Sequence, residues 1–441
     1  MATNPISAFN LASPTLETGR VVIEASAGTG KTYSLTVLAI RHVAERNLTA
    51  DQLLMVTFTI SATAELREKT REQAQDTLQH LRNKNLEHQW MSSMLATEAS
   101  RLAAIANLEQ FLAHFDQATI TTIHGFCQIV LKRAGLHSPA PQNYTVQDNV
   151  DEIINQVLTD LLIDPMSQNA RLLHGEMNKQ GGGVHPLKAA DVRKSLSNLH
   201  DAVKRYIGNP KALLLPALSP SSLATKIDLL KNDKDIRHTK QAEIIAGLVL
   251  QVVAEVQRRS YDARIITYDD MVRMVAETLD ADNDVAKNLA TSIATQYSLV
   301  MVDEFQDTDG EQMDLLLAAK EKLNARLFVV GDTKQGIYRF RGAEGSAFTE
   351  LDKRIKQRKL KSPLIFRLNR NFRSGQELLD SLHPYFKAWG EKDLLDYQDK
   401  NRLKHNVKRT KSSKRLITQV VGYQDEANRA AKTVAQWRKK N

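Results

Sequence analysis

Residues 25–32 read Ala25-Ser26-Ala27-Gly28-Thr29-Gly30-Lys31-Thr32, between the apolar run Val21–Ile23 and a helical stretch that reaches Arg46. A glycine-rich turn between a strand and a helix is typical of a phosphate-binding loop. Gly28 and Gly30 would let backbone N–H groups approach phosphate oxygens at the start of the helix. Lys31 would supply a cation to the β- and γ-phosphates, and Thr32 a hydroxyl ligand for Mg²⁺. A glycine is usual where Ala25 stands, and the alternative interpretation is a glycine-rich helix start that binds nothing.

Around this loop, strand-like and helix-like stretches alternate, as they do in an α/β protein with a parallel sheet. Segment 140–259 interrupts the alternation because it is rich in helical signals, so we predict an inserted helical subdomain there. The last strand-like run, Leu364–Leu368, is expected to begin another domain. The runs with the length of buried strands are Leu53–Thr59, Thr119–Ile123, Leu299–Val302, Leu327–Val330 and Leu364–Leu368.

Two acidic residues, Asp303 and Glu304, directly follow the apolar run Leu299–Val302. The carboxyl ends of parallel strands meet at one edge of a sheet, so both residues should lie beside the phosphate loop. There Asp303 would hold Mg²⁺, and Glu304 would orient and polarise an attacking water as a general base. An Asp-Glu pair after a strand also begins many helices. That alternative loses weight when a phosphate-binding loop is present in the same chain.

A third polar segment, Gly331–Gly342 (GDTKQGIYRFRG), again follows an apolar run. Its Gln335 would hydrogen-bond a γ-phosphate or the attacking water. Tyr338, Phe340 and Arg341 combine aromatic rings with a cation, which suits stacking on bases and binding of phosphates. The alternative is that the two rings are ordinary core residues. A segment that reaches both a nucleotide and a polynucleotide would couple hydrolysis to movement.

The composition is that of an ordinary soluble protein, with 42% hydrophobic and 25% charged residues in 441. It argues against global disorder and against collagen-like or membrane classes. No apolar run reaches the ~18 residues that cross a bilayer, and the N-terminus lacks secretory-signal features. A single cysteine, Cys127, excludes an intrachain disulfide framework, so we expect a cytoplasmic location. The formal net charge of +9 favours an acidic partner such as a phosphate backbone.

Six ordered segments resemble the motifs of the UvrD/Rep branch of superfamily 1 DNA helicases. More narrowly, they resemble the RecB-like beta subunits of exodeoxyribonuclease V, which processes double-strand breaks for recombination. The segments are EASAGTGKT (24–32), TFTISATAELREK (57–69), TIHGFCQ (122–128), VDEFQDTD (302–309), GDTKQGIYRFRGA (331–343) and LNRNFRS (368–374).

The resemblance implies a P-loop NTPase fold of the RecA-like type. A motor domain would be formed by residues 1–139 and 260–360, with the inserted helical subdomain at 140–259, and a second RecA-like domain would start in 361–441. The implied cofactors are ATP and Mg²⁺. The implied activity is 3′→5′ translocation on single-stranded DNA in double-strand-break repair, acting at DNA ends with RecC-like and RecD-like partner subunits.

The resemblance also implies roles for single residues. Phe372 would pack on adenine, and Arg373 would reach the γ-phosphate and neutralise charge that develops during phosphoryl transfer. His124 would touch a DNA phosphate or only hydrogen-bond within its loop, and the motif Tyr268–Met271 would be structural. The residues expected at DNA are Phe58, Thr59, Arg67, Thr122, His124, Tyr338, Phe340 and Arg341.

Two departures from the family pattern affect these expectations. Many members carry an adenine-reading glutamine before the phosphate loop, and the nearest residue here is Glu17, which leaves adenine selectivity open. The chain also ends at Asn441, before any segment that resembles the last two helicase motifs or the nuclease domain. We therefore expect a fragment that binds nucleotide weakly and hydrolyses it poorly.

Other classes of protein remain as alternatives. One alternative is a P-loop ATPase or kinase that acts on small molecules or proteins. The aromatic segment after Gln335 argues against this class, and ATPase activity independent of DNA would favour it. A non-catalytic DNA-binding clamp would have no need to keep the predicted catalytic set. Within the superfamily, a stand-alone repair helicase or an AddA-type subunit is the closest alternative. The predicted catalytic set is Lys31, Asp303, Glu304, Gln335 and Arg373.

Overall fold

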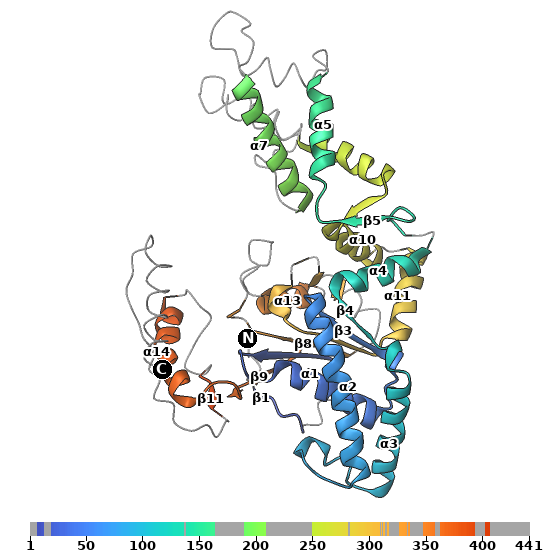
Figure 1. The fold of residues 1–441 in the computed structure, drawn as a ribbon, viewed down its shortest axis with the longest axis vertical. Helices are drawn as coiled ribbons and strands as arrows, with labels where there is room; N and C mark the ends of the chain where they lie inside the picture. Colours follow the sequence, from blue (N-terminus) through green and yellow to red (C-terminus); the bar gives the residue numbers. More distant parts are fainter. Residues whose placement is uncertain are drawn as a thin grey trace, which may run out of the picture.

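A seven-stranded sheet lies at the centre of the protein, in the order β1-β9-β2-β8-β7-β3-β4 with every neighbouring pair parallel (Figure 1). The structure is a computed structural model that describes residues 7–12, 19–135, 138–163, 189–208, 249–280, 283–308, 310, 312–313, 315–316, 326–332, 334–335, 347–357, 362–392 and 402–405. The predicted α/β fold with a parallel sheet is confirmed. The strands are β1 (Ser7–Ala8), β2 (Arg20–Ala25), β3 (Leu53–Thr57), β4 (Thr119–Thr122), β7 (Leu299–Val302), β8 (Arg326–Gly331) and β9 (Leu364–Leu368).

The central strands are buried on both faces because alternate side chains enter two different cores. In β3, Leu53 and Met55 pack with helices on one face, whereas Leu54 and Val56 pack with helices on the other. The first face is covered by α1 (Lys31–Arg46), α2 (Ile60–Arg82) and α3 (Glu98–Ala113). The second is covered by α4 (Ile123–Ala134), α10 (Tyr268–Asp280), α11 (Asp284–Gln296) and α13 (Ala347–Gln357).

Strand β9 belongs to this sheet, where it pairs with β2 on one side and β1 on the other. The expectation that Leu364–Leu368 opens a second domain is therefore wrong for the strand itself. Phe366 lies beside Ile23 in the register and packs against the same core. The Arg367 guanidinium also donates to the Glu24 carboxylate, with Nε to Oε2 at 3.0 Å. Apolar packing and an ion pair thus hold β9 next to the strand that leads into the phosphate loop.

A separate core lies in the segment 140–259, whose described residues are mostly helical. The helices α5 (Asp151–Ile163) and α7 (Ala189–Gly208) pack with helical residues 249–262. Figure 1 shows α5 and α7 projecting away from the central sheet. A parallel pair, β5 (Thr145–Gln147) and β6 (Ile265–Thr267), lies at the base of the projection. Residues buried in this core include Ile154, Val157, Val203, Val252 and Val256.

The chain beyond β9 forms a second parallel pair and a helix. The pair is β10 (Arg370–Asn371) with β11 (Lys404–His405), and the helix is α14 (Gln376–Glu391), which buries none of its residues. Among the described helices, none combines the length and the apolar character that crossing a bilayer requires. The short 3₁₀ helices are η2 (Ala50–Gln52), η3 (Gln89–Met91), η4 (Phe115–Gln117) and η6 (Phe305–Asp307).

Candidate nucleotide and DNA site

Most of the predicted site residues lie at one edge of the sheet. All the strands are parallel, so their carboxyl ends meet at this edge and the residues that follow them come together. The phosphate loop follows β2, and the acidic pair follows β7. The other segments at this edge are Phe58 after β3, Asp332 after β8 and Asn371–Ser374 after β9.

The phosphate-binding loop passes through left-handed backbone at Gly28 (φ 75°) and Gly30 (φ 81°), which glycine adopts without strain. The Thr29 hydroxyl closes the turn by donating to the Ser26 carbonyl at 2.7 Å. Gly28 also lies against the segment after β9. A Cβ atom on Gly28 would stand 2.7 Å from the Cβ of Arg373, which is closer than two such atoms approach. A residue with a side chain would therefore not fit here.

Asn371 fastens the segment after β9 to the phosphate loop. Its Nδ2 donates to the Ala27 carbonyl at 2.8 Å, and its Oδ1 accepts from the Arg373 N–H at 2.9 Å. The Phe372 N–H donates to the Gly28 carbonyl at 2.8 Å. The Phe372 ring stays 53% exposed at the phosphate loop. Phe372 and Arg373 thus stand beside the loop that the sequence assigns to nucleotide.

Lys31 and Glu304 form an ion pair, with Nζ to Oε2 at 2.6 Å. Only 11% of the Lys31 side chain is exposed. Glu304 has a left-handed backbone (φ 49°, ψ 42°), which is uncommon for a residue other than glycine and is concentrated at functional sites. The pair joins the cation that would bind phosphate to the carboxylate that would activate water.

Two further carboxyl groups stand close to Glu304. Burial, with the nearby Glu304 charge, raises the pKa of Asp303 to about 6, and the same two causes raise the pKa of Asp307 to about 6. Asp303 Oδ1 accepts from the Glu304 N–H at 2.9 Å. Asp307 Oδ1 is buried and has no hydrogen-bond partner among the described residues. A bound cation would favour the ionised form of both groups.

Asp332 connects the end of β8 to the phosphate loop. Its carboxylate is buried and accepts from the Ala27 N–H at 3.1 Å and from Gln335 Nε2 at 2.9 Å. The Lys334 ammonium donates to Ser26 Oγ at 2.7 Å and pairs with Asp332 at 3.1 Å. Gln335 therefore lies next to the loop that would bind phosphate. Sequence reasoning missed Asp332 and Lys334, although both belong to the segment that it singled out.

Sequence reasoning also missed an aromatic group beside the start of α1. Trp90 Nε1 donates to the Tyr33 hydroxyl at 3.3 Å, and the His88 and Trp90 rings are stacked with centroids 6.0 Å apart. Trp90 is buried, whereas Tyr33 is 41% exposed two residues after Lys31. His88 and Trp90 come from the connection between α2 and α3, which carries no motif. The only local signal is the aromatic residue directly after Gly-Lys-Thr.

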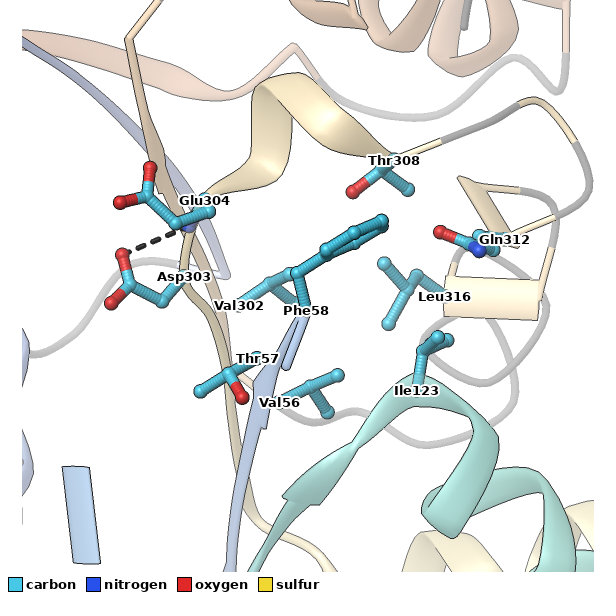
Figure 2. A pocket seen from close by; sticks show the side chains of 10 residues that line it. All are labelled: Val56, Thr57, Phe58, Ile123, Val302, Asp303, Glu304, Thr308, Gln312 and Leu316. Atoms are coloured by element: carbon cyan, nitrogen blue, oxygen red, sulfur yellow. Dashed lines mark hydrogen bonds between the residues drawn. The ribbon is translucent and has the colours of Figure 1, made fainter. Parts of the chain in front are cut away.

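Phe58 lines a pocket on the other side of the acidic pair. Figure 2 shows its ring pointing toward Thr308, Gln312 and Leu316, while the Asp303 and Glu304 carboxylates point away from it. Phe58 is half-buried, and Ile60, two residues on, is 83% exposed. The end of β3 therefore presents apolar surface next to the predicted nucleotide site.

The other described residues that the sequence assigns to DNA all have contacts within the protein. Thr59 caps α2 by accepting from the Ala62 N–H at 3.1 Å, and Thr122 caps α4 by accepting from the Gly125 N–H at 3.1 Å. Arg67 donates to the Ile120 carbonyl at 3.1 Å. The His124 ring packs edge-on against Tyr268, with centroids 4.9 Å apart. These contacts give each residue a structural task beside its predicted DNA role.

The motif Tyr268–Met271 has the geometry of a helix start. The Asp270 carboxylate accepts from the Thr267 N–H at 3.1 Å, and the Thr267 hydroxyl accepts from the Asp270 N–H at 3.1 Å. Met271 is fully buried. These contacts agree with the structural role expected for the motif. Other predictions fall on Glu17, Tyr338, Phe340 and Arg341, which lie outside the described residues.

The fold and the site together define a class. A parallel sheet whose buried strand β2 leads into a glycine-rich loop, with Lys31 contacting an acidic residue after β7, defines a P-loop nucleotide-binding protein. The particular family follows from comparison with known sequences. The chain belongs to the UvrD/REP helicase N-terminal domain family, whose sequence profile matches residues 8–356.

Curated relatives carry more specific names. The RecBCD enzyme subunit RecB of Mycolicibacterium smegmatis is 30% identical over 83% of this chain and 30% of its own length. The RecB subunit of Haemophilus influenzae is 26% identical over 83% of this chain and 40% of its own length. An ATP-dependent helicase/nuclease subunit of Bacillus licheniformis is 24% identical over 87% of this chain and 40% of its own length. The chain thus spans 30 to 40% of the length of these relatives.

Proposed function

We propose that this chain is the ATP-driven motor segment of a DNA helicase that moves along single-stranded DNA in the 3′→5′ direction. One observation carries the proposal. The phosphate loop, the acidic pair and the segment with Phe372 and Arg373 meet at one edge of a parallel sheet, in a chain of a helicase family. Each of these groups has a task in phosphoryl transfer, and none is needed by a protein that only binds DNA.

The nucleotide would bind along the start of α1. The backbone N–H groups of residues 25–32 would surround the phosphates, and the Lys31 ammonium would exchange Glu304 for a phosphate oxygen. Phe372 would stack on the base and Arg373 would neutralise charge on the transferred phosphoryl group. The close approach of Gly28 and Arg373 supports this assignment, because it holds the arginine against the phosphate loop.

The residues at this edge also suit Mg²⁺. A hydroxyl from Thr32 and a carboxylate from Asp303 are the hard oxygen ligands that this ion prefers. The raised pKa of Asp303 supports the fit, since a nearby cation would offset the cost of ionising a buried carboxyl group. When bound, the ion would supply positive charge to the phosphate oxygens. We infer that Thr32 and Asp303 are its protein ligands.

Hydrolysis would use two side chains as guides for water. Glu304, once Lys31 has turned to phosphate, would accept a proton from the attacking water. Gln335 would hydrogen-bond the γ-phosphate or the water, and its present contact with Asp332 keeps it beside the phosphate loop. Gln335 lies in the same segment as Tyr338, Phe340 and Arg341. A shift of Gln335 when the γ-phosphate is released would therefore move these DNA-binding residues.

DNA would cross the surface next to Phe58. The ring stands at the end of β3, adjacent in the sheet to β7, which carries the acidic pair, so base stacking and nucleotide chemistry would share neighbouring strands. The remaining predicted contacts would grip the phosphate backbone. The proposed DNA-binding residues are Phe58, Thr59, Arg67, Thr122, His124, Tyr338, Phe340 and Arg341.

For the domains, we propose a motor domain from residues 1–139 and 260–360 with strand β9 added to its sheet. The separate core of α5, α7 and residues 249–262 supports an inserted helical subdomain at 140–259. Residues that follow β9, up to 441, would begin the second motor domain. The pairing of β9 with β2 in the first sheet supports β9 as the connection between the two domains.

The relatives named as RecB subunits of a RecBCD enzyme support a place in an enzyme of that type. For it we propose a helicase–nuclease role in double-strand-break repair, with RecC-like and RecD-like partners, DNA ends as substrate and a cytoplasmic location. An AddA-type helicase is the second candidate, since the helicase/nuclease relative from Bacillus licheniformis matches a slightly larger share of this chain at lower identity. The higher identity of the mycobacterial RecB favours the first candidate. A stand-alone UvrD/Rep-type repair helicase is the third.

The test is ATP hydrolysis by the chain with and without single-stranded oligo(dT), beside Lys31→Ala. We expect slow hydrolysis that DNA accelerates, and a loss of at least about tenfold in Lys31→Ala because the phosphate loses its cation. Hydrolysis that DNA leaves unchanged would contradict the motor function and favour a P-loop enzyme for small molecules. A wild-type rate equal to that of Lys31→Ala would contradict the nucleotide site itself.

A further inference from the structure

Gln306 is a buried amide whose two ends are both occupied. It lies in η6, directly after the acidic pair, and is 7% exposed. Its Nε2 donates to Glu304 Oε2 at 2.7 Å, and its Oε1 accepts from the Asp332 N–H at 2.8 Å. A buried amide with both ends paired is costly to rotate, because each end would lose its partner. Gln306 therefore holds Glu304 at a fixed distance from the end of β8.

The backbone around Gln306 leaves it little freedom. A Cβ atom on Gly331 would lie 2.5 Å from Gln306 Oε1 and 3.0 Å from the Gln306 backbone nitrogen. Glycine at the end of β8 thus makes room for the amide. The Gln306 side chain packs against the end of β8, which Asp332 follows directly. A movement of this strand end would therefore also move Glu304.

Glu304 has two donors on one oxygen, and only one of them can stay when nucleotide binds. Lys31 Nζ at 2.6 Å is the group that phosphate would take away, whereas Gln306 Nε2 at 2.7 Å has no such competing task. After Lys31 turns to phosphate, the Gln306 contact is what would still orient the carboxylate. An oriented carboxylate is needed for a water to attack in line.

The contacts continue past Gln306 to the predicted γ-phosphate glutamine. Asp332, whose N–H binds Gln306, accepts from Gln335 Nε2 and from the Ala27 N–H. We propose that Gln306 is a positioning residue for hydrolysis, which fixes the Glu304 carboxylate and ties it to the strand end that carries Gln335. The proposal rests on the proposed ATPase function and deepens it.

Two variants of Gln306 test the proposal in single-turnover ATP hydrolysis, with the full chain in excess over ATP. Gln306→Leu removes both hydrogen bonds at nearly constant volume, and Gln306→Glu replaces the donor toward Glu304 with a second carboxylate. We expect the hydrolysis rate constant to fall about tenfold or more in both. The Kd for a fluorescent ATP analogue should stay within about threefold, because the Gln306 side chain bonds Glu304 and Asp332 and not the phosphate loop.

The difference between the rate constant and the affinity separates positioning from a merely structural role. A variant that only loosened the fold would lose rate constant and nucleotide affinity together, whereas loss of positioning lowers the rate constant alone. A rate constant equal to wild type in Gln306→Leu would overturn the proposal, and so would a parallel loss of nucleotide affinity and rate in both variants.

Gln52→Leu is the matched control. Gln52 Oε1 also accepts a backbone N–H, from Thr49 at 3.1 Å, but in η2 and without contact to Glu304. Gln52→Leu should leave the hydrolysis rate constant and the Kd unchanged. Lys31→Ala distinguishes failure of the ATPase function from failure of the positioning role. If wild type hydrolyses ATP no faster than Lys31→Ala, both the ATPase function and the positioning role are wrong. If wild type is faster than Lys31→Ala and Gln306→Leu matches wild type, only the positioning role is wrong.

Discussion

The ion pair between Lys31 and Glu304 has a direct consequence for nucleotide binding. A phosphate oxygen and the Glu304 carboxylate would compete for the same ammonium group, so ATP must displace a contact of 2.6 Å before the phosphate is held. Breaking a partly buried pair offsets part of the binding free energy. The competition gives a physical reason for the weak nucleotide binding that we expect of this chain. The ion pair would also occupy Glu304, the proposed general base, until phosphate arrives.

The raised pKa values of Asp303 and Asp307 predict a pH dependence of stability. Each group binds its proton more tightly in the folded chain (pKa about 6) than in the unfolded one (ordinary value 3.8). Their stabilising contribution is thus present below pH 3.8 and is lost as the pH rises through about 6. Asp303→Asn cannot ionise, so it should raise the free energy of unfolding above pH 6 by about 1–3 kcal/mol.

Urea denaturation in EDTA at pH 4, 6 and 8 measures this difference. The gain from Asp303→Asn should be near zero at pH 4 and reach its full size at pH 8. Asp380→Asn is the control, because hydrogen bonds from Arg402 and Gln376 lower the pKa of this exposed carboxyl group and the sign of its effect is opposite. A difference between wild type and Asp303→Asn that is the same at pH 4 and pH 8 would contradict the assignment.

At the scale of elements, helix caps predict how structural and DNA-binding roles can be separated. Thr122 caps α4 through the Gly125 N–H at 3.1 Å, and Thr97 caps α3 in the same way through the Ser100 N–H at 3.0 Å. Thr122→Ala and Thr97→Ala should each lower the free energy of unfolding by about 1 kcal/mol. Only Thr122→Ala should also weaken binding of oligo(dT), since only Thr122 is proposed to touch DNA.

Thermal unfolding and fluorescence anisotropy give the two readouts. Thr122→Ser keeps the hydroxyl and should restore both stability and affinity. Equal DNA affinity in Thr122→Ala and Thr97→Ala would mean that Thr122 acts as a cap alone.

The elements also mark how far the sequence could be interpreted. The limits of β7 and β9 could be predicted to the residue. Strand β7 is a short apolar run between polar residues, and β9 is apolar except for Arg367 and lies between Pro363 and Asn369. The sheet partner of β9 could not, because the Glu24–Arg367 contact joins residues 343 positions apart and leaves no local signal. For the same reason the motifs indicated Lys31 and Glu304 singly, while their ion pair and the Gln306 contacts required the folded sheet.

At the scale of the whole molecule, the net charge of +9 predicts salt-dependent DNA binding. Each phosphate that the protein neutralises should contribute a slope of about −0.7 in a plot of log affinity against log salt for a single strand. Phe58→Ala should weaken binding of oligo(dT) by about 1–3 kcal/mol at every salt concentration. This variant loses base stacking but keeps every ion pair with phosphate. The slope should stay that of wild type.

Anisotropy titrations between low and moderate salt test this prediction. Leu102→Ala is the control, since Leu102 is an exposed apolar residue on α3, away from the edge that carries the motifs. It should change neither affinity nor slope. A slope that flattens in Phe58→Ala, or an affinity that does not change, would remove Phe58 from the DNA site.

The contact between Trp90 and Tyr33 gives the protein an intrinsic optical probe. The sequence has three tryptophans, and Trp90 is a buried one whose indole N–H is bound to a half-exposed tyrosine two residues after Lys31. Indole emission responds to hydrogen bonding and polarity at its edge. Nucleotide binding at the phosphate loop should therefore shift the wavelength of the protein's intrinsic tryptophan emission. This shift should be absent in the control variant Trp90→Phe.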